Sequence, residues 1–230
     1  IETSNFNNIT FSGTNTKTAL GAFSITGNVK IENNSSFDAG TFSHSVNGNW
    51  ITNGTFISAG TITFSGSSDS VSGTASTTFY NVSASNSLFL LGNVNISNSI
   101  SSSGSVIQSS GTTSILGTST LLSGTVSLNN LSIGNGKKLV LSQNADLQIT
   151  GLVTLAGNGT IDAVTQSPTT VEFNSPGSQA IPGLIYHHFS INNGGMKTVV
   201  GNITINGDVF IDVNDTLNDG SNNITFKGDI

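Results

Sequence analysis

The chain has 230 residues and a formal net charge of −6, and it contains no Cys, which excludes a disulfide framework. Its six cationic residues are all Lys, so nucleic-acid binding is not expected, because phosphate neutralisation needs clustered Lys and Arg. No apolar run approaches the roughly 20 residues that a membrane-spanning helix needs, and no membrane span is expected.

Ser, Thr, Asn and Gly account for 36, 29, 29 and 27 residues, which is more than half of the chain. Such a composition can indicate disorder, but disorder also requires low hydrophobicity and high net charge. Here 35% of the residues are apolar, and they are spread evenly along the chain. Helix-favouring residues are scarce whereas β-branched and turn-forming residues abound, so the sequence predicts an all-β protein.

Short alternating segments recur from the beginning of the chain to its end. Each has the pattern apolar–polar–apolar, and this period of two places the apolar pair on one face of a strand. Clusters of Gly, Asn, Asp and Ser separate the segments and supply turns. The segments of this kind are, in chain order, 29–31, 62–64, 94–96, 126–128, 131–133, 147–149, 153–155, 171–173, 203–205 and 224–226.

Internal repeats connect distant parts of the chain. The stretch KTALGAFSITGNVKI at 17–31 resembles KTVVGNITINGDVFI at 197–211 without a gap. A second motif, an aromatic or apolar residue followed by two polar residues and an alternating segment, begins near residues 6, 79, 128 and 186. Because these starts are unevenly spaced, the repeats suit a solenoid better than a propeller, whose blades need a near-constant period. We therefore expect a single array of degenerate repeats over residues 1–230.

The predicted fold is a parallel β-helix, or β-solenoid, of about ten coils with roughly 20–25 residues each. Its narrow interior would be filled by apolar side chains. Those that we expect to point inward are Ile25, Val29, Ile31, Ile205, Val209 and Ile211. The alternative fold is an antiparallel β-sandwich, which the Asn-Gly pairs at 53–54 and 206–207 favour because such pairs form hairpin turns.

Four motifs succeed one another in the first half of the chain: GNWITNGTF at 48–56, GTITFSG at 60–66, FYNVS at 79–83 and LGNVNI at 91–96. Together they resemble the repetitive stretches of very large secreted bacterial surface proteins. The resemblance implies a parallel β-solenoid of an adhesin-like or extracellular-matrix protein, with a secreted or cell-surface location. It implies no catalytic residue and no cofactor.

Both ends of the chain are rich in strand-forming residues, and position 1 is Ile rather than Met. Residues 228–230 align with 48–50, which lead into further repeat in the first copy. A solenoid normally needs polar caps over its ends. We therefore expect either a segment of a longer array or a subunit that self-associates end to end.

The densest group of charges consists of Asp208, Asp212, Asp215 and Asp219. Ca²⁺ prefers six to eight oxygen ligands, so these carboxylates are a candidate calcium site. However, neither the EF-hand spacing nor a Gly-rich nonapeptide calcium repeat is present. A solvated turn is the preferred interpretation, and no metal or cofactor is predicted.

Few other residues could carry chemistry. The adjacent His187 and His188 would point to opposite faces of a strand and could not chelate one metal ion from it. A polysaccharide lyase or hydrolase would need paired carboxylates, or a base with a cationic partner. Asp162 and Glu172 are the only acids between residues 147 and 207, and nothing marks them as partners. We therefore predict that the protein is not an enzyme.

Binding and modification roles stay open beside the structural one. Ice binding would require Thr-x-Thr motifs at equivalent positions of successive coils, and the motifs that occur are irregularly spaced. Asn-x-Ser/Thr triplets are candidate glycosylation sites, although this composition produces them by chance. They begin at Asn8, Asn34, Asn53, Asn81, Asn95, Asn130, Asn158, Asn202, Asn214 and Asn223.

The sequence as a whole predicts a non-enzymatic extracellular structural protein. It would be a β-solenoid segment or subunit of a cell-surface filament or adhesin stalk. Its expected partners are further copies or further repeats of the same array, and surface glycans. The alternative function is that of a glycan- or ice-binding β-helical module.

Overall fold

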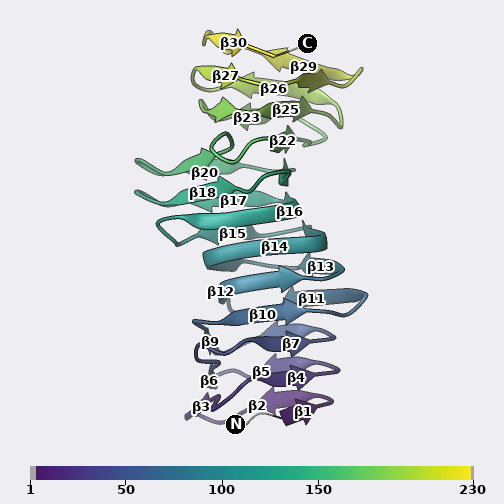
Figure 1. Cartoon of the computed structure of the whole chain (residues 1–230), viewed down its shortest axis with the longest axis vertical. Helices are drawn as coiled ribbons and strands as arrows, with labels where there is room; N and C mark the ends of the chain where they lie inside the picture. Colours follow the sequence, from purple (N-terminus) through teal and green to yellow (C-terminus); the bar gives the residue numbers. More distant parts are fainter. Residues whose placement is uncertain (1–3, 229–230) are drawn as a thin grey trace. The chain divides into compact units, whose positions relative to one another are not determined.

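A computed structural model describes residues 4–228 (Figure 1). Its regular elements are all β-strands, and the chain divides into two compact units, Ile1–Ser114 (unit 1) and Ile115–Ile230 (unit 2). In each unit parallel strands stack as successive coils of a β-solenoid, with about 11 turns in total. The described residues include no helix long and apolar enough to cross a membrane.

Unit 1 is built from short strands, apart from one of 15 residues that runs through two corners. The strands are β1 (Ser4–Phe6), β2 (Ile9–Phe11), β3 (Thr16–Thr18), β4 (Phe23–Ile25), β5 (Val29–Ile31), β6 (Ser36–Asp38), β7 (His44–Val46), β8 (Trp50–Thr52), β9 (Thr55–Ile57), β10 (Thr61–Phe64), β11 (Ser68–Ser72), β12 (Thr77–Ala84), β13 (Ser87–Leu90), β14 (Val94–Gln108) and β15 (Thr112–Ile115), which ends just past the division.

Each coil of unit 1 contributes one strand segment to each of three faces. The first face stacks β1, β4, β7, β10, the end of β12 and the middle of β14. The second stacks β2, β5, β8, β11, β13 and the end of β14, and the third includes β3, β6 and β9. Paired residues lie about one coil apart in sequence, for example Val29 with Trp50 and Phe79 with Ile96.

Alternation along each strand decides which side chains form the core. In β4 and β5 the first and third residues are buried and the middle one is half exposed. Ile25, Val29 and Ile31 are accordingly 0–1% exposed. Because stacked coils place equivalent residues above one another, apolar side chains form continuous columns that exclude water from the interior.

Unit 2 has the same construction with a wider spread of coil lengths. Its strands are β16 (Thr120–Leu128), β17 (Asn130–Ile133), β18 (Lys138–Leu141), β19 (Asp146–Ile149), β20 (Val153–Leu155), β21 (Thr160–Asp162), β22 (Thr170–Phe173), β23 (Gln179–Ile181), β24 (Ile185–Tyr186), β25 (His188–Ile191), β26 (Gly195–Val199), β27 (Ile203–Ile205), β28 (Val209–Ile211), β29 (Asp215–Asn218) and β30 (Ile224–Phe226).

One face of unit 2 is continuous and the other two are interrupted. The continuous ladder runs through β16, β19, β22, β25 and β28. On the other faces, β21 pairs with β18 and β20 with β17, whereas β23–β26–β29 and β24–β27–β30 form separate sheets. The only prolines of the chain lie between β21 and β24, where these two faces are interrupted; they are Pro168, Pro176 and Pro182. Proline cannot donate a ladder hydrogen bond, which favours a break there.

Asparagine side chains join successive coils at the corners. The Oδ1 atom of Asn8 accepts a hydrogen bond from Asn28 N–H at 2.7 Å, and Asn28 Oδ1 accepts one from Asn49 N–H at 2.9 Å. Asn49 Oδ1 in turn accepts one from Ser70 N–H at 3.1 Å. These bonds satisfy corner N–H groups that the strand ladders leave unpaired.

The corner beside this ladder is too tight for a side chain. A Cβ atom on Gly48 would lie 2.5 Å from the carbonyl oxygen of Gly27 in the coil below. Elsewhere, Asn34 and Asn144 turn corners with φ of 62° and 61°, a conformation that Asn tolerates better than most residues. The abundance of Gly and Asn thus follows from the geometry of the corners.

We expect Asn28→Ala to destabilise unit 1 by about 0.5–1.5 kcal/mol, because Asn49 N–H loses its intramolecular acceptor but stays within reach of water. Chemical denaturation followed by circular dichroism measures the change. Asn33→Ala is the matched control, since Asn33 is an exposed corner residue outside this ladder. Equal losses in the two variants would contradict a role for the ladder.

The structure confirms the predicted fold class. All ten alternating segments lie within strands, and residues 17–31 and 197–211 form equivalent strands, with β4 and β5 matching β27 and β28. The pairings within both units are parallel, so the antiparallel sandwich is wrong. The comparison of 228–230 with 48–50 falls partly outside the described residues.

Four of the six side chains expected to point inward are buried: Ile25, Val29, Ile31 and Ile205. Val209 is half exposed and Ile211 is 42% exposed. Both occupy inward positions, because they pair with the buried Phe189 and Ile191. Their exposure has a simple reason: no described strand follows β28 in this ladder to cover them.

Candidate functional site

The first face of unit 1 carries a column of small polar side chains on its outer side, which we call the hydroxyl column. Its members pair in register from coil to coil and are Asn5, Ser24, Ser45, Thr63, Ser83 and Ser101. Ser45 Oγ donates a hydrogen bond to Ser24 Oγ at 2.8 Å. Coils in such a ladder are about 4.8 Å apart, so the column offers hydroxyl groups at a regular spacing.

A second, shorter column runs beside it two residues earlier in each strand. Asn81 pairs with Thr61 on one side and with Ser99 on the other. Asn81 Nδ2 donates to Thr61 Oγ1 at 3.3 Å, and Ser99 Oγ donates to Asn81 Oδ1 at 2.7 Å. The two columns together form a nearly uncharged surface of hydroxyl and amide groups.

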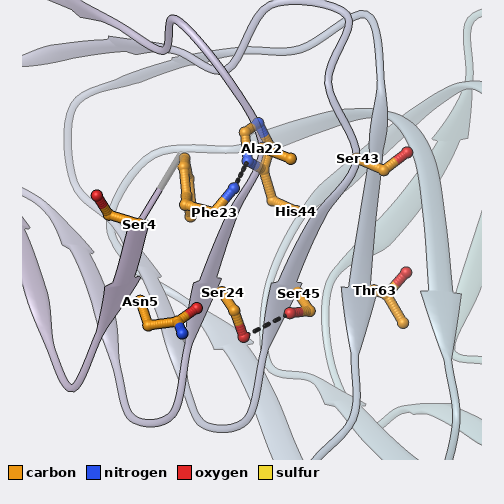
Figure 2. A pocket seen from close by; sticks show the side chains of 9 residues that line it. All are labelled: Ser4, Asn5, Ala22, Phe23, Ser24, Ser43, His44, Ser45 and Thr63. Atoms are coloured by element: carbon orange, nitrogen blue, oxygen red, sulfur yellow. Dashed lines mark hydrogen bonds between the residues drawn. The ribbon is translucent and has the colours of Figure 1, made fainter. Parts of the chain in front are cut away.

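A shallow depression of about 420 Å³ lies at the N-terminal part of this surface. Figure 2 shows its walls: Ser4, Asn5, Ala22, Phe23, Ser24, Ser43, His44, Ser45 and Thr63. The depression exists because small side chains occupy the outer positions of four successive coils. Its polar groups can exchange hydrogen bonds with a neutral ligand, but it contains no carboxylate and no Lys.

His44 forms the floor of the depression and is fully engaged by the chain. It is 1% exposed and its ring stacks on Phe23 with a centroid distance of 3.8 Å. Phe23 N–H donates to Nδ1 at 3.2 Å, which leaves the proton on Nε2, and Nε2 donates to the Ala39 carbonyl at 2.9 Å. Burial lowers the pKa of His44 below its ordinary value, although the bond to Ala39 opposes this shift. The ring is therefore a neutral core residue.

We expect His44 to make stability depend on pH. Because its pKa is lowered on folding, the unfolded chain binds its proton first. The contribution of His44 to stability is fully present above its pKa in the unfolded chain, about 6.5. It is lost as the pH falls from 6.5 towards the lower pKa of His44 in the folded chain, by at most about 1.4 kcal/mol per pH unit. Denaturation at several pH values between 7 and 5 measures the slope.

The comparison with His44→Gln isolates this contribution. Burial raises the pKa of Asp69 and of Asp146, and raised carboxyl pKa values act in the opposite direction and at lower pH. They are common to both proteins and cancel in the difference. Parallel stability curves for the wild type and His44→Gln would show that His44 does not titrate in this range.

Unit 2 contains a buried ion pair. The side chains of Lys197 and Asp215 are both 0% exposed, with Nζ 3.1 Å from Oδ1. The ammonium group also donates to the carbonyl oxygens of Ser175 at 2.8 Å, Gly177 at 3.3 Å and Gly194 at 2.5 Å. Asp215 Oδ2 accepts a bond from Gly194 N–H at 3.2 Å. The pair therefore joins segments of three successive coils.

A buried glutamine extends this network towards the preceding coil. Gln179 Nε2 donates to the carbonyl oxygens of Ile149 and Gly151 at 2.9 and 2.7 Å. Gln179 Oε1 accepts a bond from Ser175 N–H at 3.2 Å. The side chain thereby bridges the interruption between β20 and β23 with hydrogen bonds that the strand ladder does not provide. We call Gln179, Lys197 and Asp215 the polar spine.

The four acids of the candidate calcium site take different partners. Asp215 is occupied by Lys197, while Asp212 Oδ1 and Asp219 Oδ1 accept bonds from the N–H groups of Val213 and Ser221. Within residues 4–228 no group of three or more His, Asp or Glu side chains is placed to hold a metal ion. The structure thus does not bring the four carboxylates of this candidate site together.

The histidine pair lies where the chain enters β25, whose first residue is His188. The rings of His187 and His188 meet edge to face with centroids 4.3 Å apart. Asp208 N–H donates to His188 Nδ1 at 3.0 Å, so the 3.4 Å approach of the Asp208 carboxylate to the same nitrogen is not a hydrogen bond. Burial, and secondarily the neighbouring His188, lower the pKa of His187. Nothing here resembles a general base directed at a substrate.

The asparagines of the candidate glycosylation sites divide into three groups, one of which, Asn81 and Asn95, donates side-chain N–H bonds to threonine hydroxyl groups. The side-chain oxygens of Asn8, Asn53, Asn130 and Asn202 accept backbone N–H bonds from the next coil. Asn34, Asn158, Asn214 and Asn223 are exposed at corners or turns. Glycosylation at any of them stays a prediction.

Sequence reasoning missed both the hydroxyl column and the polar spine. Lys197 and Asp215 lie 18 residues apart, which is one coil in this part of unit 2, and this spacing is the signal that could have paired them. In comparisons with known proteins, no family model, no curated protein and no solved structure matches the chain.

Proposed function

We propose that the protein is a non-enzymatic extracellular structural protein, a β-solenoid segment or subunit of a cell-surface filament or adhesin stalk. The observation that carries the proposal is the in-register stacking of coils within each unit, with corners joined by asparagine side chains. Separating two coils requires many backbone bonds to break together, which suits a part that bears load.

The chemistry of the surface and the sequence motifs support the same role. Four repeat motifs resemble those of large secreted bacterial surface proteins, and the chain lacks Cys and carries few charges. Sparse charge limits repulsion between neighbouring copies or repeats. The function does not require a catalytic group, a cofactor or a metal.

Location and form of the native material test this proposal. Antibodies against the chain should label intact cells that produce it, without permeabilisation, and negative-stain electron microscopy should show stalks or filaments at the labelled positions. Labelling that requires permeabilisation, or purely monomeric soluble protein in the medium, would refute the proposal.

The hydroxyl column favours a second candidate function, glycan binding. The column mixes Ser, Thr and Asn, and among the strands that carry it only β10 presents two outward Thr residues. Neutral sugars exchange hydrogen bonds with such groups without needing a uniform Thr lattice, whereas ice binding needs aligned Thr rows. A glycan array tests this function: Ser45→Tyr, which fills the depression, should abolish binding, and Thr154→Tyr on an exposed site of unit 2 should not.

A further inference from the structure

The interruption in unit 2 leaves an open sheet edge. Thr160 N–H donates to the Lys137 carbonyl at 3.1 Å, so the peptide groups of Thr160 face β18. Successive residues of a strand direct their N–H and C=O groups to opposite sides, and those of Ile161 therefore face away from β18. Within residues 4–228, β21 has no strand pairing on that side. Such unpaired edges are templates for pairing with another strand.

A depression of about 360 Å³ adjoins this edge, and we call it the β21 slot. Its walls are Lys138, Thr160, Ile161, Asp162 and Val164 on one side and Gly183, Leu184 and Ile185 on the other. The volume is at the lower end of the range of ligand sites. Ile185 is 51% exposed and offers an apolar surface beside the unpaired edge.

The charges at the slot are already neutralised by one another. Asp162 Oδ2 lies 3.7 Å from Lys138 Nζ and accepts a bond from Thr165 Oγ1 at 2.8 Å, while Oδ1 accepts one from Thr165 N–H at 3.0 Å. A ligand there meets main-chain donors and acceptors, apolar side chains and no uncompensated charge. The matching ligand is therefore an uncharged polypeptide in extended conformation.

We propose that the β21 slot binds an uncharged, extended segment of another polypeptide, which adds to β21 as a parallel strand. The segment alternates polar–apolar–polar. Its central residue lies opposite Ile161; the residue before it accepts a hydrogen bond from Ile161 N–H, and the residue after it donates one to the Ile161 carbonyl. This is strand addition at a sheet edge, in which main-chain bonds give affinity and side-chain contacts give selectivity. The site belongs to unit 2 and is independent of the structural role proposed above.

A capped, fluorescently labelled peptide with the sequence of residues 60–64, Gly-Thr-Ile-Thr-Phe, is a suitable probe because it is uncharged and alternates as required. Fluorescence anisotropy with the full chain should show saturable binding. N-methylation of the second Thr removes the N–H group that would reach Ile161, and we expect it to weaken binding by about tenfold or more. Absence of saturable binding up to about 1 mM chain would overturn the proposal.

Ile185→Lys places a charge at the slot from an exposed position, and it should also weaken binding by about tenfold. Phe210→Lys is the matched control, since Phe210 is 59% exposed on β28, and it should bind as the wild type does. If Ile185→Lys fails to fold, the N-methylated peptide still tests the proposal on the wild-type protein. Equal binding of the N-methylated and the unmodified peptide would contradict the proposal. So would a chain that binds no peptide but self-associates, if Ile185→Lys abolishes the self-association.

Discussion

Lys197→Met is expected to lower the free energy of unfolding of unit 2 by about 3–5 kcal/mol, because it leaves the Asp215 carboxylate buried without its cation. Both side chains are 0% exposed, so water cannot replace the lost ammonium group. The carbonyl oxygens of Ser175, Gly177 and Gly194 lose their donor in the same step. The three coils that meet at the polar spine should separate first.

The internal repeat supplies a matched control for this variant. Lys17 occupies the equivalent position of the first copy, but it is half exposed and its ammonium group donates to the Gly13 carbonyl at 2.9 Å. Lys17→Met should change stability by no more than about 0.5 kcal/mol, as surface substitutions usually do. The same substitution at matched repeat positions thus separates the effect of the buried ion pair from that of losing a Lys side chain.

Hydrogen exchange is the appropriate measurement, because a solenoid opens locally rather than as a whole. Lys197→Met should accelerate exchange in β23, β26 and β29, while Lys17→Met should not. The double variant Lys197→Met/Asp215→Leu should recover most of the loss, since replacing both partners of a buried pair by apolar groups is often tolerated. Unchanged protection of β26 in Lys197→Met would show that the pair adds nothing to stability.

The periodicity of the sequence predicts the strands, and the uneven spacing of the repeats favours their arrangement as a solenoid. Eight of the ten apolar–polar–apolar segments, 29–31 and 203–205 among them, bury both apolar side chains, and the other two, 153–155 and 224–226, are strands with partly exposed ones, so alternation locates the strands. Repeats of unequal length favour the parallel arrangement of a solenoid, because coils that differ in length can still place their strands on top of one another, whereas the blades of a propeller need a near-constant length. The Asn-Gly pairs indicate hairpins wrongly, because Asn and Gly form solenoid corners as well as two-residue turns.

Features that depend on pairing between coils could not be predicted in the same way. The partner of Lys197 depends on the number of residues in one coil, and this number varies along the chain. For example, the coil between the paired residues Leu147 and Val171 is longer than the next coil, between Val171 and Phe189. The hydroxyl column likewise appears only after the register is known, because its members are ordinary Ser, Thr and Asn residues in a chain rich in all three. The open edge of β21 has no sequence signal except the three prolines that follow it.

The largest core effect is expected from Trp50→Ala, with a loss of about 3–5 kcal/mol, because the neighbouring rings cannot collapse into the space. Trp50 is 0% exposed and lies edge to face against Phe56, Phe79 and Phe64, with ring centroids 4.6, 6.1 and 6.4 Å away. These rings belong to two successive coils of unit 1, so the cavity would loosen the stacking of one coil on the other. Tyr80→Ala, at a 38% exposed position, is the surface control.

A hydrogen bond holds the Trp50 indole within this cluster. Substitutions at its two ends separate the contribution of ring packing to stability from that of the hydrogen bond. Trp50 Nε1–H donates to Thr52 Oγ1 at 2.9 Å, and Thr77 Oγ1 donates to the same oxygen at 2.9 Å. Thr52→Val should cost about 1–3 kcal/mol, because two buried donors lose their acceptor. Trp50→Phe keeps an aromatic ring and removes one of those donors, so the double variant Trp50→Phe/Thr52→Val should lose less than the sum of the two single variants. Chemical denaturation of the wild type, the two single variants and the double variant measures the coupling between the two sites. If the two losses of stability add strictly, the indole is held by its aromatic neighbours alone, and the hydrogen bond between Thr77 and Thr52 stabilises the coil independently of it.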